Sequence, residues 1–68
     1  MKLDQAIRMG MGKKKMNAEQ LADRALVHRV TVHRWINNKS KPDKIRQQDL
    51  AVIFGVSYAE FLRWGRLL

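Results

Sequence analysis

Helix start and stop signals stand so close together in this sequence that they allow only short helices. Asn17 and Ser57 are each followed three residues later by a polar partner, Gln20 and Glu60, a spacing typical of a capping box. Gly55 is a natural residue to end a helix, because glycine adopts the left-handed backbone without strain. Together with the apolar periodicity, these signals predict five short helices, no strand and therefore an all-α chain.

Apolar residues recur at helical spacing within each expected helix. The helices are expected at residues 2–11, 17–25, 29–37, 44–54 and 57–64. The residues predicted to face the core are Leu21, Ala22, Ala25, Val32, Trp35, Ile36, Ile45, Leu50, Ile53, Phe54 and Phe61. Gly10 and Gly12 are expected to weaken the end of the first helix, so that Lys13, Lys14 and Lys15 form an exposed basic connector.

The chain carries a large excess of positive charge. Fourteen Lys and Arg against six Asp and Glu give a net charge of +8 at pH 7. On a chain this small, the excess predicts a polyanionic partner, either nucleic acid or an acidic membrane surface. A basic membrane binder needs its lysines and aromatic residues on one continuous helix, and the glycine and proline breaks argue against that arrangement.

The length of the chain and its lack of cysteine limit the number of domains and the compartment in which the protein is expected. Sixty-eight residues hold one small domain, residues 1–68, with no room for a second core. Without cysteine the chain has no disulfide and no thiolate zinc site, which fits a reducing compartment. The longest uncharged stretch, residues 50–59, is too short to span a bilayer, and we expect a cytoplasmic protein.

The most informative stretch is 17–42, where two short amphipathic helices are joined by a short turn and the second helix is basic. The major groove of B-form DNA admits one α-helix, and the helix before it must cross and brace it. The small Ala22 allows the two helices to approach closely, while Val32 and Trp35 supply the apolar underside of the second. Residues 17–37 are therefore predicted to form a helix pair that binds DNA.

Motifs over nearly the whole chain point to one family. The capping Asn17 precedes the pair Leu21 and Ala22, and the basic helix ends near Trp35. These features lie within MNAEQLADRALVHRVTVHRWINNKSKPD, which is followed by LAVIFGVSYAEFL with a Gly-Val-Ser helix start at residues 55–57. The pattern resembles the helix-turn-helix of the Cro/repressor (Xre-like) family of phage and bacterial transcription regulators. The resemblance implies a compact five-helix, lambda-repressor-like fold and sequence-specific binding to double-stranded DNA.

The resemblance and the basic chemistry of the second helix assign contacts to individual residues. The residues expected to contact bases are Arg29, Val30, Thr31, His33 and Arg34. The residues expected to contact phosphates are Asn17, Ala18, His28, Asn37, Lys39 and Lys41. An arginine guanidinium matches guanine O6 and N7 with two hydrogen bonds, although Arg29 and Arg34 could equally form a solvated face or bind phosphate. Packing or capping is the alternative role for Val30 and Thr31.

Two residues depart from the family pattern at the turn. Where the family commonly has glycine, this chain has Leu26, for which a left-handed backbone costs free energy. Where the family has a capping Ser or Thr, this chain has His28, a poorer helix cap. Either the turn is remodelled or the basic helix starts one residue away from Arg29.

The C-terminal segment has more apolar residues than one short helix can bury against so small a body. Trp64, Leu67 and Leu68 are candidate dimer contacts, and the alternative is that they fold back over the first helix. Because Cro-like proteins commonly bind operators as dimers, the resemblance implies a homodimer on DNA.

These observations predict a transcriptional repressor of the phage or prophage Cro type, which occupies an operator and excludes RNA polymerase. It is expected in the bacterial cytoplasm, associated with the nucleoid. The chain is expected to end where the DNA-binding domain ends. We expect no enzyme activity, cofactor or small-molecule ligand, because the six carboxylates are scattered and mostly at helix starts. His28 and His33 lie on different helix faces, so no metal site is expected. The alternative function is a protein-interaction module, such as the antitoxin of a toxin–antitoxin pair, that uses the apolar C-terminus.

Overall fold

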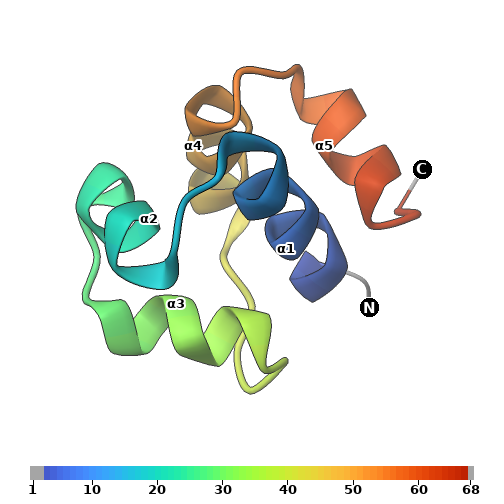
Figure 1. Cartoon of the computed structure of the whole chain (residues 1–68). Coiled ribbons are helices and arrows are strands. Elements are labelled where there is room, and N and C mark those ends of the chain that lie inside the picture. Colours follow the sequence, from blue (N-terminus) through green and yellow to red (C-terminus); the bar gives the residue numbers. More distant parts are fainter. Residues whose placement is uncertain (1–2, 68) are drawn as a thin grey trace.

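The computed structural model describes residues 3–67, which form five α-helices joined by turns and loops (Figure 1). The helices are α1 (Leu3–Lys14), α2 (Ala18–Ala25), α3 (Arg29–Ile36), α4 (Lys44–Ile53) and α5 (Tyr58–Trp64). Residues 3–67 contain no strand, and the prediction of an all-α, five-helix fold is confirmed. Among these helices, none combines the length and the apolar character that crossing a membrane requires.

The helices enclose one apolar core. α2 packs against α3 and α4, α1 packs against α3 and α5, and α4 also packs against α5. In Figure 1, α2 and α3 form one side of the molecule and α5 lies at the opposite side. The largest fully buried side chains are those of Phe54, Phe61, Ile7, Leu21, Leu50 and Val32. No polar or charged residue among the described ones is buried, so the core itself consists of apolar side chains.

The first helix is longer than the sequence predicts. α1 continues through Gly10 and Gly12 and ends at Lys14, so Lys13 and Lys14 belong to the helix and not to a connector. Gly10 is buried, and the ring of Phe54 occupies the space that a Cβ at this position would need. Packing against the core therefore outweighs the weak helix propensity of glycine.

Three of the four residues predicted to face the core from α4 do so, namely Leu50, Ile53 and Phe54. Leu50 and Ala51 are buried, as is Phe54 at the end of the helix, whereas Ile45 is 69% exposed. The prediction that Ile45 faces the core is wrong, because a separation of five residues at about 3.6 residues per turn rotates it well away from Leu50. Ile45 and Val52, which are seven residues apart, share the solvent-facing side of α4.

The turn between α2 and α3 forms without a glycine. Leu26 adopts the left-handed backbone, with φ 58° and ψ 42°, and its side chain is 86% exposed. The N–H of Val27 donates to the carbonyl of Ala22 at 3.1 Å and closes the end of α2. His28 Nδ1 accepts an N–H of the first turn of α3 at 3.1 Å, so the histidine caps this helix. α3 starts at Arg29 as predicted, and the two alternatives, a remodelled turn and a shifted helix start, are both wrong.

Both predicted capping residues begin a helix. The side chain of Asn17 accepts the N–H of Gln20 at 2.8 Å, and the side chain of Gln20 accepts the N–H of Asn17 at 2.9 Å, which completes the capping box. The hydroxyl of Ser57 accepts the N–H of Glu60 at 3.1 Å. The carboxylate of Glu60 accepts a hydrogen bond from Nε1 of Trp64 at 3.1 Å, so this acid also holds the indole ring in place.

The C-terminal segment packs onto the body of the protein. Trp64 and Leu67 are partly buried against the core, and the indole centroid lies 6.2 Å from the ring of Phe54 and 6.4 Å from that of Phe61. α5 packs against α1, and Nζ of Lys13 lies 5.7 Å from the centroid of the Trp64 ring, so the structure shows the fold-back alternative for Trp64. Leu68 lies outside the described residues. The dimer contacts assigned to these three residues stay a prediction.

Candidate nucleic-acid interface

α3 has one apolar face in the core and one polar face in solvent. Val32 and Trp35 are buried, and α1 and α2 both pack against this helix. The predicted base-contacting residues lie on the other face, where Arg29, Val30, His33 and Arg34 are exposed and Thr31 is half-buried. The core thus fixes α3 with its polar face outward, as the groove-binding helix of the predicted pair requires.

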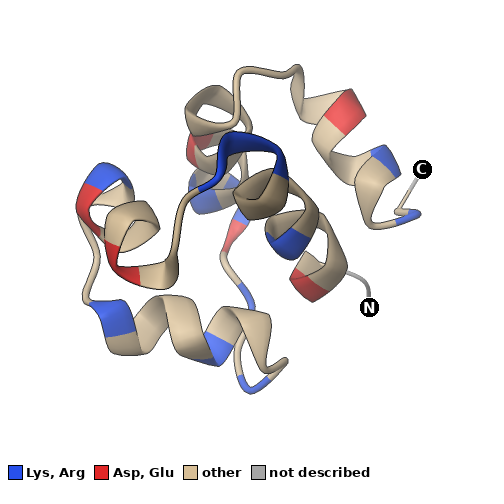
Figure 2. Cartoon of the chain, viewed as in Figure 1, with Lys and Arg blue, Asp and Glu red and all other residues tan. Residues whose placement is uncertain are grey.

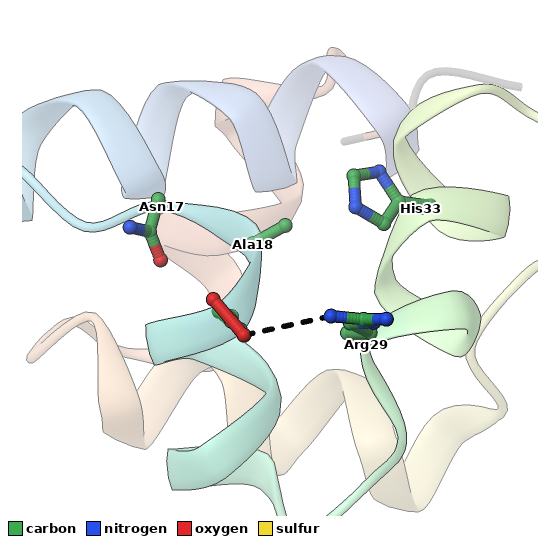
Figure 3. A pocket seen from close by; sticks show the side chains of 5 residues that line it. Asn17, Ala18, Arg29 and His33 are labelled. Carbon is green, nitrogen blue, oxygen red and sulfur yellow. Dashed lines mark ion pairs between the residues drawn. The ribbon is translucent and has the colours of Figure 1, made fainter.

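A hollow of about 310 Å³ lies between the start of α2 and the polar face of α3 (Figure 3). We call it the α2–α3 hollow; its lining residues are Asn17, Ala18, Glu19, Arg29 and His33. Figure 3 shows the α2 residues on one side and Arg29 and His33 of α3 on the other. The turn between α2 and α3 therefore brings together residues that are about ten or more positions apart in the sequence.

The start of α2 presents backbone N–H groups beside this hollow. The N–H of Gln20 donates to the side chain of Asn17, and the N–H of Leu21 donates to the carbonyl of Asn17 at 3.0 Å. The N–H groups of Ala18 and Glu19 belong to the first turn, which has no partners within the helix. Free N–H groups at a helix start, together with the helix dipole, favour a negatively charged ligand such as a phosphate.

An ion pair joins the two sides of the hollow. Oε1 of Glu19 lies 3.7 Å from Nη1 of Arg29, and the two side chains are 69% and 63% exposed, respectively. Exposed pairs of this kind contribute about 1 kcal/mol or less to stability, because water screens them. The sequence places Glu19 in the first turn of α2, where the helix dipole already explains an acid, and gives no signal for the contact with Arg29.

The loop after α3 folds back onto the end of that helix. Asn37 ends α3, and Asn38 adopts the left-handed backbone with φ 59°. The N–H of Lys39 donates to the carbonyl of Arg34 at 2.8 Å. Because Asn37, Lys39 and Lys41 are all exposed, the predicted phosphate-contacting side chains of this loop are presented next to the C-terminal end of α3.

Two arginines that sequence reasoning missed brace the helix pair. Arg8 of α1 donates to the carbonyl of Ile36 at the end of α3, and Nη1 of Arg46 donates to the carbonyl of Ala25 at the end of α2 at 3.0 Å. Each satisfies a carbonyl that its own helix leaves free. No local pattern signals these contacts, because the partners are 28 and 21 residues apart in the chain.

The structure divides the predicted site residues into groups along α3. One group lies at the α2–α3 hollow and consists of Asn17, Ala18, Arg29 and His33. A second group lies at the other end of α3 and consists of Asn37, Lys39 and Lys41. Between the two groups, along the helix, lie Val30, Thr31 and Arg34. His28 uses Nδ1 to cap α3, which leaves its other ring nitrogen for a further partner. Figure 2 shows basic residues along α3 and in the loop after it, and a second basic cluster at the end of α1.

Residues 6–61 match the helix-turn-helix family, and the chain therefore belongs to it. The match confirms the resemblance to Cro/repressor (Xre-like) proteins that the motifs indicate. Members of this family are DNA-binding transcription regulators, and we assign binding to double-stranded DNA to this chain on the same ground. No curated protein and no solved structure matches the chain.

Proposed function

We propose that this protein is a repressor of the phage or prophage Cro type, which acts in the cytoplasm by occupying an operator and excluding RNA polymerase. The observation that carries the proposal is the orientation of α3. Its apolar face is buried in the core, its basic face is exposed, and the first turn of α2 stands beside it as a place for a phosphate.

In the proposed complex, α3 lies in the major groove, one set of residues contacts base edges and another set contacts phosphates. Base edges are contacted by Arg29, Val30, Thr31, His33 and Arg34. Phosphates are contacted by Asn17, Ala18, His28, Asn37, Lys39 and Lys41. Contacts to base edges specify the sequence, while contacts to phosphates fix the position of the helix on the duplex. The location of the phosphate set at both ends of α3 supports this division, since the backbone strands flank the groove.

The proposed repressor binds its operator as a homodimer, with half-sites one helical turn or about 34 Å apart. Trp64, Leu67 and Leu68 are the proposed dimer contacts. Trp64 and Leu67 are partly buried within the chain, so the contact would use the portions of these side chains that stay exposed. The same packing weakens the alternative function of a protein-interaction module that uses the C-terminus.

Selection of bound duplexes from a random pool, carried out at two salt concentrations, tests the proposed function. We expect a short sequence motif repeated with two-fold symmetry to be enriched, and the enrichment to persist when added salt weakens phosphate contacts. A pool that stays random at both salt concentrations would show that the chain binds DNA without selecting a sequence, and a repressor acting at an operator would then be excluded.

A further inference from the structure

An acid at the α2–α3 hollow is unexpected on a surface that binds a polyanion. Glu19 is one of only six acids in a chain of net charge +8, yet it lines the hollow where a phosphate would meet the start of α2. Its side chain is 69% exposed, so it satisfies no buried partner. The helix dipole explains an acid at a helix start, but it does not explain why this carboxylate lies beside Arg29.

Glu19 lies within ion-pair distance of Arg29, which is one of the proposed base-contacting residues. Oε1 of Glu19 is 3.7 Å from Nη1 of Arg29, and the dashed line in Figure 3 marks this ion pair. Glu19 is in the first turn of α2 and Arg29 is the first residue of α3, so the turn between the helices sets their separation. Because both side chains are well exposed, the pair contributes little to the stability of the fold.

We propose that Glu19 is a specificity-determining residue, which holds the guanidinium of Arg29 for a base contact and weakens binding to DNA that offers only phosphates. The inference rests on the proposed function. Arginine loses much rotamer freedom when it is fixed, and a partner that restrains it before binding reduces that loss. This part of the effect favours the operator, where Arg29 finds its base.

The negative charge of Glu19, by contrast, weakens binding to any duplex. A carboxylate beside the start of α2 repels a phosphate that approaches the hollow, whatever the sequence. At the operator, two hydrogen bonds from Arg29 to a guanine offset this repulsion. On other sequences Arg29 has no guanine contact to offset the repulsion. The carboxylate of Glu19 therefore increases the difference between operator and non-operator affinity.

Glu19→Gln tests the proposal, with Asp23→Asn as the matched control. Asp23 is an exposed acid one turn further along α2 and does not line the hollow, so both variants lose one negative charge but only the first removes the partner of Arg29. Dissociation constants are measured on the selected operator duplex and on a scrambled duplex of the same composition. Thermal melting of each variant checks that the fold is unchanged.

We expect Glu19→Gln to bind the scrambled duplex more tightly than wild type and to gain less on the operator, so that the ratio of the two affinities falls by about threefold. Asp23→Asn is expected to change both affinities by the same small factor and to keep the ratio. In an Arg29→Ala background, Glu19→Gln is expected to change both duplexes alike, because there is no guanidinium left to hold.

Two failures are distinguishable. If wild type discriminates between the duplexes and Glu19→Gln discriminates equally well, Glu19 is not a specificity determinant and the proposed function stands. If wild type itself binds both duplexes equally, the proposed function fails and this inference fails with it.

Discussion

Leu26 adopts the left-handed backbone conformation, which is unfavourable for leucine, and its side chain packs little against the rest of the protein. Its φ of 58° lies in the left-handed region, where a residue with a Cβ is destabilised by roughly 1–2 kcal/mol. Its side chain is 86% exposed, so burial does not offset that cost. The end of α2 nevertheless closes here, because the core contacts of α2 and α3 fix both helices and leave only residues 26–28 to join them.

Leu26→Gly is therefore expected to stabilise the protein by about 1 kcal/mol, since glycine adopts the left-handed backbone without a Cβ clash. Thermal or urea unfolding measures the change. The neighbouring Val27→Gly serves as the control and should destabilise, because Val27 packs partly against the core. A loss of stability in Leu26→Gly would mean that the exposed leucine side chain contributes more than its backbone costs.

Arg29 and Arg34 are the residues whose removal should change sequence preference. Replacing either with alanine is expected to cost about 1–3 kcal/mol on the operator and to relax the preference at one base pair. Binding titrations against duplexes with single base-pair changes measure both effects. Arg63→Ala, which removes an exposed basic residue of α5, is the control and should leave the preference unchanged. An equal loss on every duplex would identify the arginine as a phosphate contact.

At the scale of elements, α1 shows that two glycines in one helix can have opposite roles. The ring of Phe54 fills the space beside Gly10, so the absence of a side chain there lets α1 approach the core closely. Nothing lies within 4 Å of the position that a Cβ on Gly12 would take. The first glycine is therefore required by packing, whereas the second only lowers the propensity of the helix.

Gly10→Ala and Gly12→Ala make a matched pair that tests this difference. Gly10→Ala is expected to destabilise the protein by about 1–3 kcal/mol, because the methyl group overpacks the core at Phe54. Gly12→Ala is expected to stabilise it by roughly 0.5–1 kcal/mol, because alanine has the higher helix propensity and meets no neighbour. Unfolding curves of the two variants check the signs. Equal effects would mean that α1 does not approach Phe54 as described.

At the scale of the whole molecule, every helix carries Lys or Arg, and two groups of these basic residues lie apart from each other. Figure 2 shows one set of basic residues along α3 and its following loop and another at the end of α1, far from α3 in this view. The net charge of +8 attracts DNA at long range from any direction. In the proposed complex, Lys39 and Lys41 beside α3 replace counterions on the phosphates, whereas the lysines at the end of α1 do not.

Lys39→Ala and Lys41→Ala are each expected to weaken binding on every duplex and to reduce the slope of log affinity against log salt by about one unit. Lys14→Ala removes the same charge at the end of α1 and is expected to keep the slope. Binding titrations over a series of salt concentrations measure it. If Lys14→Ala changed the slope as much as the loop variants, the end of α1 would belong to the interface.

Much of the fold was predictable because its signals are local. The capping box at Asn17, the glycine after α4 and the apolar faces of α2 and α3 each depend on residues within one or two turns. The candidate site was predictable for the same reason, since the exposed face of α3 is the side opposite Val32 and Trp35. The outward position of Ile45 follows from the same local periodicity, since a separation of five residues turns it away from Leu50, so that prediction failed on helix geometry and not on tertiary packing.

The sequence by itself determined where the helices start, that the chain is a helix-turn-helix protein, and which side chains α3 turns to solvent. Hydrogen bonds and apolar spacing over three or four residues carry that information. The tertiary structure alone decided the length of α1, the burial of Trp64, the bracing by Arg8 and the contact between Glu19 and Arg29. These features join residues from different helices, and their energies depend on the packing of the whole core.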